Sequence, residues 1–283
     1  MNRCREFEVA ISAVLEAGEV LMRYFKNKNY RITYKSKFGK SPVTDADIKS
    51  NEILKKNIVS AFPDDGWFSE ETADDMLRLE KRRVWIVDPL DGTKSFIRGV
   101  SEFTISIALV EDGIPIVGVV YNPPGEELYF ASRGNGAYLF KGDTLRGLKN
   151  LNVEEIKDYR FYASKSKKSV KEAVIIASKG EIEKNETLKN LVGKFGEVRF
   201  RKSIAYKIVS VAIGWADALV SLSSKNEWDI AGAHVIAEEA GLKVTDSFGE
   251  KIFYNERNAK KKGIIVANEI LHNEILKILN LRK

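Results

Sequence analysis

Four short apolar segments lie close together in the first half of the chain, and they limit its possible folds more than any other feature. They span residues 84–87, 103–110, 116–121 and 128–131. Turn-forming residues separate the last three, Asp112-Gly113 in one gap and Pro123-Pro124-Gly125 in the other. Short apolar runs joined by such turns are typical of neighbouring strands. The pattern therefore predicts an antiparallel meander.

Helical patterns stand on either side of these strands. Apolar residues recur at helical spacing over residues 5–25, and a second helix is expected from Thr44 to about Phe62, before Pro63. Further on, we expect strands over 173–177, 216–222 and 263–267, and helices over 203–214, 229–240 and from Glu269. The chain is therefore predicted to have an α/β (α+β) fold, with a sheet-rich half, residues 1–145, and an alternating half, residues 146–283.

The cysteine and histidine content limits which covalent cross-links and metal sites the chain can form. Cys4 is the only cysteine among 283 residues, which excludes an intramolecular disulfide and a cysteine-built zinc or iron–sulfur site. His234 and His272 are the only histidines, too few to suggest a histidine metal cluster. No apolar run approaches the roughly 18 to 20 residues that span a bilayer, and the polar start shows no signal peptide. We therefore expect a cytoplasmic protein that does not bind membranes.

The charge balance favours a small anionic partner. The chain has 46 Lys and Arg residues and 40 Asp and Glu residues, a formal net charge of +6, with both signs interleaved along most of its length. The densest basic run, residues 260–262, is expected to be a solvated loop rather than a nucleic-acid patch. Nucleic acid is therefore not the expected partner.

The segment Trp85-Ile86-Val87-Asp88-Pro89-Leu90-Asp91-Gly92-Thr93 is the most informative for chemistry. An apolar strand runs directly into two aspartates, and Pro89 favours an extended backbone at Asp88. This geometry can aim both carboxylates and the Leu90 carbonyl at one point beyond the strand. Such hard oxygen ligands suit Mg²⁺ or Mn²⁺ rather than zinc. The alternative is structural, with Asp88 as a cap and Asp91 in a turn.

The end of the same segment favours a bound phosphate. Gly92 permits a tight turn. Gly92 and Thr93 are then expected to open a helix whose free N–H groups can hold phosphate oxygens.

Two further acidic sites strengthen the metal interpretation. Glu70 and Glu71 form an adjacent pair upstream of the motif, although such a pair is usually solvated surface. Asp229 precedes an apolar helical face, where an N-cap is the common explanation, and its neighbour Trp228 is more often core packing. Carboxylates at strand and helix ends without a histidine base indicate metal-assisted hydrolysis, in which ions activate water and neutralise the leaving group.

These residues resemble the signature motifs of the inositol monophosphatase superfamily, which comprises magnesium-dependent, lithium-sensitive phosphomonoesterases. The matching blocks, in family order, are Pro42-Val43-Thr44-Asp45-Ala46-Asp47, Ser69-Glu70-Glu71, Asp88-Pro89-Leu90-Asp91-Gly92-Thr93, and Trp228-Asp229-Ile230-Ala231-Gly232 with Ala240-Gly241. The similarity covers nearly the whole chain. It implies a layered αβαβα sandwich of the sugar-phosphatase type, a homodimer, and hydrolysis of a small phosphate monoester without a covalent intermediate.

The resemblance also implies a role for each matching residue. The implied ligands of two or three Mg²⁺ ions, for which Mn²⁺ can substitute, are Glu70, Asp88, the Leu90 carbonyl, Asp91 and Asp229. Glu70 and Thr93, the latter polarised through Asp47, would orient the attacking water. Asp91, Gly92 and Thr93 would contact the substrate, and residues 35–41 would form a mobile flap over the metals.

Shorter stretches, residues 93–97, 101–104 and 118–123, look most like the 3′(2′),5′-bisphosphate nucleotidases, which hydrolyse adenosine 3′,5′-bisphosphate. Lys207 falls where that group carries a substrate-binding lysine, with Ser203 one turn before it. The alternative is a lysine that snorkels at the edge of a helix face. Two positions depart from the pattern. Ser221 stands where some nucleotidases have arginine and inositol phosphatases have glutamate, and Ile204 stands where nucleotidases often have serine.

Other substrates and one other function stay open. Relatives of this fold hydrolyse inositol phosphates, fructose 1,6-bisphosphate or histidinol phosphate. For a nucleotide substrate, Lys202 and Lys225 can supply the positive charge of the missing arginine. A regulatory or RNA-associated binding protein is a more distant alternative, favoured by the net charge and the lysine-rich residues 165–171. Five converging oxygen donors favour the enzyme, since a binding protein has no physical need of them.

Overall fold

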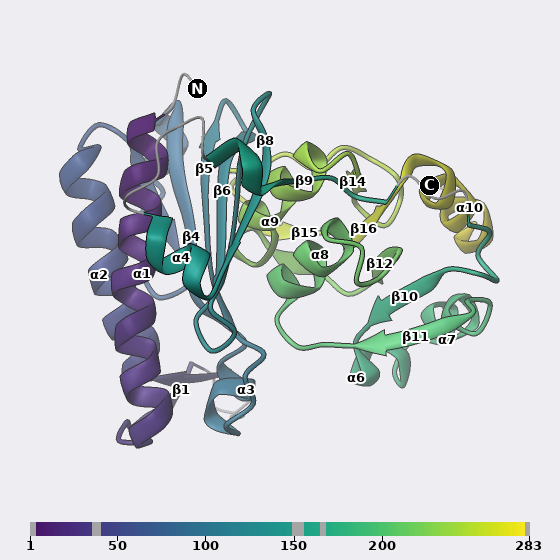
Figure 1. Cartoon of the computed structure of the whole chain (residues 1–283), viewed down its shortest axis with the longest axis horizontal. Helices are drawn as coiled ribbons and strands as arrows, with labels where there is room; N and C mark the ends of the chain where they lie inside the picture. Colours follow the sequence, from purple (N-terminus) through teal and green to yellow (C-terminus); the bar gives the residue numbers. More distant parts are fainter. Residues whose placement is uncertain (1–3, 36–40, 149–155, 165–167, 281–283) are drawn as a thin grey trace.

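The computed structural model describes residues 4–35, 41–148, 156–164 and 168–280. Its elements stack in five layers, helices, sheet, helices, sheet and helices, which follow one another from left to right in Figure 1. This arrangement confirms the predicted α/β (α+β) class and the αβαβα sandwich. The division of the chain into residues 1–145 and 146–283 stays a prediction. Strand β9 lies after this boundary and pairs with β8, which lies before it.

The first sheet has seven strands in the order β3-β4-β5-β6-β7-β8-β9. Their bounds are β3 Gly66–Ser69, β4 Arg83–Asp91, β5 Thr104–Glu111, β6 Ile114–Asn122, β7 Glu127–Ser132, β8 Gly136–Lys141 and β9 Arg160–Phe161. Strands β4 to β7 form the predicted antiparallel meander. Strand β3 runs parallel to β4. The sequence patterns above predict neither β3 nor β8 nor the two-residue β9.

Two long helices, α1 (Cys4–Asn27) and α2 (Asp45–Ala61), cover the outer face of this sheet, close to their predicted bounds (Figure 1). Strand β4 shows why both faces of the sheet are covered. Trp85 and Val87 belong to the core shared with α1 and α2, whereas Val84 and Ile86 belong to the core shared with α8 and α9. The start of α2 is fixed by Thr44, whose hydroxyl accepts two backbone N–H groups of the first turn.

The middle layer consists of α8 (Ile204–Ala212) and α9 (Glu227–Glu239), both near their predicted places. Two glycines let α9 lie directly on the first sheet. A Cβ on Gly118 of β6 would overlap the carbonyl oxygen of Gly232 in α9. A Cβ on Gly232 would lie 2.7 Å from the carbonyl oxygen of Ile107 in β5. At this crossing the backbones of helix and sheet therefore meet without an intervening side chain.

The second sheet has five strands in the order β11-β10-β12-β16-β14. Their bounds are β10 Val174–Ala177, β11 Glu197–Phe200, β12 Ala218–Ser221, β14 Lys243–Thr245 and β16 Ile264–Ala267. Strand β10 is parallel to β11 and β12, and β16 is antiparallel to β12 and β14. Helices α7 (Glu186–Val192) and α10 (Glu269–Leu279) close the outer face of this sheet, and the short α6 (Lys179–Ile182) follows β10.

Short elements complete the described chain. They are the pair β1 (Ile32–Tyr34) and β2 (Pro42–Thr44), the pair β13 (Lys225–Asn226) and β15 (Lys260–Lys261), α3 (Thr93–Ile97), α4 (Asp143–Gly147), and 3₁₀ turns at Leu77–Glu80 and Lys157–Tyr159. Residues 260 and 262 are exposed, as expected of a solvated segment, but the expectation of a loop is wrong for residues 260–261, which form β15, and the expectation of solvation is wrong for Lys261. Lys261 lies in a strand and is only 7% exposed, because it forms an ion pair with buried Glu227. Within the described ranges, no helix combines the length and apolarity needed to cross a membrane.

Candidate metal and phosphate site

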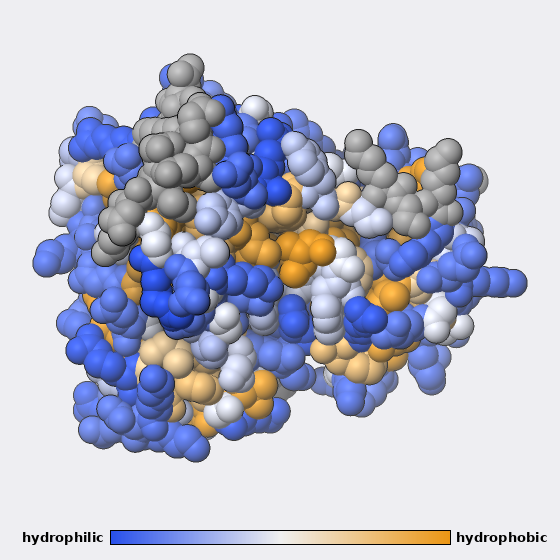
Figure 2. All heavy atoms as spheres, in the orientation of Figure 1, coloured by the Kyte–Doolittle hydropathy of each residue, from blue (hydrophilic) through white to orange (hydrophobic). Residues whose placement is uncertain are grey.

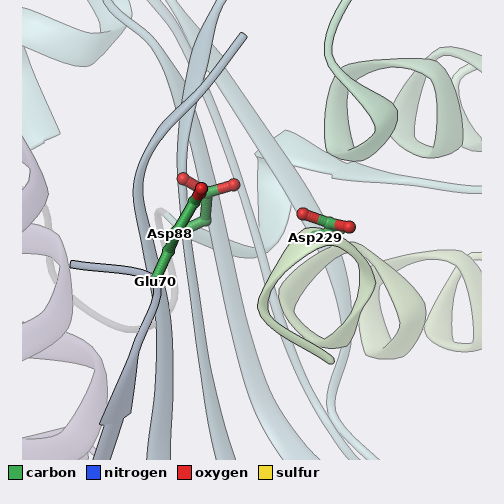
Figure 3. A group of neighbouring side chains, drawn as sticks. All are labelled: Glu70, Asp88 and Asp229. Atoms are coloured by element: carbon green, nitrogen blue, oxygen red, sulfur yellow. The ribbon is translucent and has the colours of Figure 1, made fainter. Parts of the chain in front are cut away.

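Three carboxylates from distant parts of the chain meet between the first sheet and α9 (Figure 3). Glu70, Asp88 and Asp229 each offer an oxygen, and these oxygens all lie within 4.8 Å of one another. Glu70 reaches this point because β3 runs parallel to β4. Its N–H donates to the Val87 carbonyl at 3.2 Å, which places it beside Asp88. Asp229 comes from the first turn of α9. One cation can therefore contact acids that are far apart in sequence.

The end of β4 sends the two aspartates of the motif to different partners. The register of β4 against β5 shifts between Asp88 and Asp91. Asp88 is buried and accepts the N–H of Leu90 at 3.0 Å. Asp91 Oδ2 instead accepts the Ser203 hydroxyl at 2.6 Å and the Ala205 N–H at 2.9 Å, both at the start of α8. Asp91 therefore ties the end of β4 to α8 and lies outside the group of three carboxylates.

Burial makes this cluster an unfavourable place for several negative charges. Burial, with the charges of Asp91 and Glu70, raises the pKa of Asp229 to about 7. Burial, followed by the charges of Glu70, Asp91 and Asp229, raises the pKa of Asp88 well above its usual range. Desolvation and neighbouring anions both disfavour the ionised carboxyl group. A divalent cation among these oxygens would offset both effects.

Lys35 provides one positive charge beside the cluster. Its Nζ lies 3.0 Å from Glu70 Oε1 and 2.7 Å from Glu71 Oε1. The Glu71 side chain is only 5% exposed, so this acid pair is not solvated surface. Burial, partly offset by Lys35, raises the pKa of Glu71 to about 7. Of the expected flap, residues 36–40 lie outside the described residues; the N–H of Lys35 donates to the Ser41 carbonyl at 3.0 Å.

Asp47 and Thr93 form a second polar group next to the motif. Thr93 Oγ1 lies 2.8 Å from Asp47 Oδ1 and 3.2 Å from the Leu90 carbonyl oxygen. The other Asp47 oxygen accepts the N–H of Thr44 at 2.7 Å and its hydroxyl at 2.6 Å. Since Thr44 is the N-cap of α2, the capping box of this helix holds Asp47 in place. The Thr93 hydroxyl is thereby oriented by a fixed, buried carboxylate.

The predicted helix opening at Thr93 is confirmed. Helix α3 begins at that residue, and Gly92 is its N-cap with φ of 108°. A side chain at Gly92 would be strained by this left-handed backbone, and its Cβ would lie 3.0 Å from the Glu102 carbonyl oxygen. Glycine is therefore required for the turn that follows the two aspartates.

Two lysines, the buried Lys207 and the half-buried Lys225, lie close enough to Asp91 for its charge to act on them. Lys207 of α8 is 5% exposed, and its Nζ donates to the Ser178 hydroxyl at 2.5 Å. Lys225 Nζ donates to the Ser223 hydroxyl at 2.6 Å. Burial, together with the charge of Lys225, lowers the pKa of Lys207 to about 8, while Asp91 opposes the shift. Among the described residues, neither ammonium has a carboxylate oxygen within ion-pair distance.

Glu181 of α6 is a residue of this region that the sequence analysis missed. One of its oxygens accepts the N–H groups of Leu222 and Ser223 at 2.6 and 2.7 Å, and the other accepts the Ser221 hydroxyl at 2.7 Å. Its charge also opposes the lowering of the pKa that burial imposes on Lys225. The only sequence signal is its place just after β10, at the sheet edge where β12 also ends.

The structural alternatives considered for these residues have different outcomes. Lys207 is too deeply buried to snorkel at a helix edge. Trp228 does pack in the core, edge-on to Phe68 with ring centroids 5.1 Å apart. Asp229 serves two purposes. Its carboxylate accepts the N–H of Asn226 at 2.7 Å, which closes a capping box at the start of α9, and it also belongs to the carboxylate cluster.

Comparison with known proteins finds relatives of matching length. The model described as the inositol monophosphatase family matches residues 4–282. A fructose-1,6-bisphosphatase/inositol-1-monophosphatase of Thermotoga maritima is 30% identical over 96% of this chain and 95% of its own. A 3′(2′),5′-bisphosphate nucleotidase CysQ of Buchnera aphidicola is 30% identical over 84% of this chain and 83% of its own. The crystal structure of the extragenic suppressor protein suhB of Bartonella henselae has a TM-score of 0.80 at 27% identity and covers 98% of this chain and 99% of its own.

Proposed function

Because the chain belongs to the inositol monophosphatase family and is a phosphatase, we propose that it hydrolyses adenosine 3′,5′-bisphosphate, a 3′(2′),5′-bisphosphate nucleotide, with Mg²⁺. The products would be adenosine 5′-monophosphate and inorganic phosphate. Relatives at the same identity carry names with different substrates. The choice of substrate therefore rests on the residues of this chain.

The cluster of Glu70, Asp88 and Asp229 carries the proposal. Its donors, all carboxylate oxygens within 4.8 Å of one another, are the hard ligands that Mg²⁺ prefers, and Mn²⁺ is compatible with them. Burial and mutual repulsion raise the pKa of Asp88 and of Asp229, so these acids gain from a divalent cation. We expect two or three ions, with Asp91 and the Leu90 carbonyl as further ligands. When bound, Mg²⁺ activates water and neutralises phosphate charge.

The chain's own residues would orient the reacting groups. Thr93 Oγ1, held by Asp47 at 2.8 Å, and the Glu70 carboxylate would position the attacking water and accept its proton. The N–H groups of Gly92 and Thr93, at the start of α3, would hold phosphate oxygens. Asp91 and Ser203 are linked by a 2.6 Å hydrogen bond, which would fix the substrate end of the site relative to its metal end.

Lys207 and Lys225 favour a substrate with a second phosphate. Among the described residues both ammonium groups donate to serine hydroxyls and neither forms an ion pair, although the charges of Asp91 and Glu181 act on both, and a largely desolvated cation without an ion pair is unfavourable. The 5′-phosphate of the nucleotide would supply that partner. Inositol 1-phosphate has no second anionic group, so it would leave both ammonium groups without an ion-pair partner.

A sugar bisphosphatase is the second candidate. Fructose 1,6-bisphosphate also carries two phosphates, and the Thermotoga maritima relative is named for that substrate and for inositol 1-phosphate. Histidinol phosphate is a more distant choice. A homodimer, lithium inhibition and a cytoplasmic location stay predictions for this chain.

Phosphate release from a panel of esters tests the proposal. The panel contains adenosine 3′,5′-bisphosphate, inositol 1-phosphate, fructose 1,6-bisphosphate and histidinol phosphate, with Asp91→Asn as the blank. A preference for the nucleotide of tenfold or more in kcat/KM, about 1.4 kcal/mol, supports it. A preference for another ester would be compatible with the proposed metal site but would contradict the nucleotide as substrate. No release by folded, Mg²⁺-loaded protein would favour a binding protein on this fold.

A further inference from the structure

Arg78, in the 3₁₀ turn Leu77–Glu80, is a charged residue in the interior of the molecule. Hydrophilic side chains cover most of the face seen in Figure 2, yet Arg78 is only 2% exposed. Its guanidinium forms an ion pair with Asp74, with Nη2 2.9 Å from Oδ2, and its Nε donates to the same oxygen at 3.0 Å. A buried ion pair is weak evidence for a stabilising role, so the other contacts of Arg78 indicate its purpose.

The flat face of the guanidinium lies against an aromatic pair next to the carboxylate cluster. Its Cζ is 3.8 Å from the ring centroid of Phe68, a buried residue of β3 that precedes Glu70 by two positions. The Phe68 ring in turn meets Trp228 edge-on, with ring centroids 5.1 Å apart. Trp228 directly precedes Asp229 in the first turn of α9. Arg78 and the two aromatic rings therefore join the end of β3 to the start of α9.

The nitrogen atoms of the guanidinium make a second connection to the start of α9. Nη1 donates to the Asn255 side-chain oxygen at 2.8 Å, and Nη2 donates to the Glu256 carbonyl at 3.1 Å. The Asn255 side chain donates back to the Arg78 carbonyl at 3.0 Å. The N–H groups of Asn255 and Glu256 donate to Glu227, the first residue of α9, at 2.8 and 3.1 Å. Arg78 therefore reaches α9 by two separate routes.

We propose that Arg78 is a positioning residue of the metal site, which fixes the separation of Glu70 and Asp229. The inference rests on the proposed function and deepens it. Glu70 follows β3 and Asp229 lies in α9, so their oxygens can hold one cation only while these elements keep their spacing (Figure 3). Mg²⁺ demands near-ideal ligand geometry, so a small change in that spacing weakens its binding. A planar guanidinium can stack with its face and donate from its edge at once, which a lysine ammonium cannot do.

Binding of Mn²⁺ to Arg78→Lys tests this role without depending on turnover. The electron paramagnetic resonance signal of free Mn²⁺ gives the dissociation constant. Lysine keeps the positive charge beside Asp74 but loses the stack and the forked hydrogen bonds, so we expect the dissociation constant to rise about tenfold. Leu188→Ala is the matched control for lost stability, because it removes a fully buried side chain from α7 on the outer face of the second sheet. It should lower the urea midpoint of unfolding and leave Mn²⁺ binding unchanged.

The outcomes separate this role from the proposed function. A loss of Mn²⁺ affinity in Arg78→Lys no larger than that in Leu188→Ala would overturn the positioning role and leave the phosphatase intact. If Arg78→Lys does not fold, Phe68→Leu decides in the same way, since it removes the ring and keeps the ion pair of Arg78. The parent chain is also assayed with adenosine 3′,5′-bisphosphate and with glycerol 2-phosphate, an ester without a second phosphate.

If the parent binds Mn²⁺ but hydrolyses neither ester, the proposed function fails, and the comparison of Mn²⁺ affinities still decides the role of Arg78. A parent chain that binds no Mn²⁺ would overturn both.

Discussion

Two carboxylates lie two residues apart on α9 and have opposite surroundings. Glu227 is fully buried and has a partner for each oxygen: Lys261 Nζ at 2.8 Å and the backbone N–H groups of Asn255 and Glu256. Asp229 is half-buried; apart from the N–H of Asn226, which it accepts at 2.7 Å, its neighbours in the cluster are other carboxylates. The first acid is compensated from within the chain, which marks a structural role. The second forms no ion pair among the described residues, so its charge is left uncompensated by a cation, as the proposed metal-binding role requires.

The largest effect is expected when an uncompensated acid is neutralised. Asp229→Asn should lower kcat by about 10³-fold or more, because it removes the charge of one of the three clustered carboxylates while keeping the shape of the site. The metal-free protein should unfold at an equal or higher denaturant concentration, since a repulsive charge is lost. Phosphate release and urea unfolding measure the two effects. Lower stability together with full activity would reverse the assignment of roles.

Breaking the compensated pair should instead damage the fold. Lys261→Met leaves Glu227 buried without its cation, so the free energy of unfolding should fall by about 3–5 kcal/mol. The double variant Glu227→Gln with Lys261→Met is the control, because it removes both charges and should recover part of that loss. Denaturant unfolding of the parent, the single variants Lys261→Met and Glu227→Gln, and the double variant gives the coupling energy of the pair. A purely additive result would mean that the pair does not contribute as a unit.

The pH dependence of stability should expose the uncompensated acid. The pKa of Asp229 rises from an ordinary 3.8 to about 7 because of burial and nearby anions. Its contribution to stability is therefore complete below pH 4 and is lost as pH rises through 7. The shift of about three units corresponds to at most about 4 kcal/mol. Unfolding of metal-free protein between pH 4.5 and 8 should show the decline, and Mg²⁺ or Asp229→Asn should flatten it. A parallel decline in Asp229→Asn would assign it to other groups.

Lys207 extends the comparison from these two anions to a buried cation, and its removal is expected to have a smaller effect on catalysis than the loss of Asp229. Lys207→Met should lower kcat/KM for adenosine 3′,5′-bisphosphate by about tenfold, near 1.4 kcal/mol, and leave glycerol 2-phosphate unchanged. Lys189→Met is a suitable control, since this exposed lysine pairs with the nearby Glu186 and belongs to α7, on the outer face of the second sheet. Equal losses of kcat/KM on both esters would mean that Lys207 maintains the structure of the site and does not contact the second phosphate.

The long helices and the strands of the meander could be located from the sequence alone, and so could the motif residues. Periodicity located α1, α2, α8 and α9, since each buries a broad apolar face, and the turn residues located the meander. It could not locate β3, whose four residues give no periodic signal, and the parallel pairing of β3 with β4 is what brings Glu70 to Asp88.

Tertiary partners set the remaining features. Lys261 belongs to a run of three lysines, which predicts an exposed side chain. Its burial is explained by the ion pair with buried Glu227, which is distant in the sequence. Glu181 belongs to no motif, because its three hydrogen-bond donors come from residues 221–223 on another strand end. Long-range charge pairing of this kind leaves no trace in local spacing.

The direct contact of α9 with the first sheet has a consequence for ion selectivity. Asp88 is anchored in β4 and Asp229 in α9, so the space between their oxygens depends on how closely the helix approaches the strands. Gly118 and Gly232 set that approach, because a single methyl group on either would force the backbones apart. Mg²⁺ needs oxygen distances near 2.1 Å, whereas Ca²⁺ accepts about 2.4 Å. On the proposed function, the two hydrogen atoms that stand in place of side chains, one of them three residues from Asp229, would thus act as the spacer that determines which ionic radius the carboxylates can enclose.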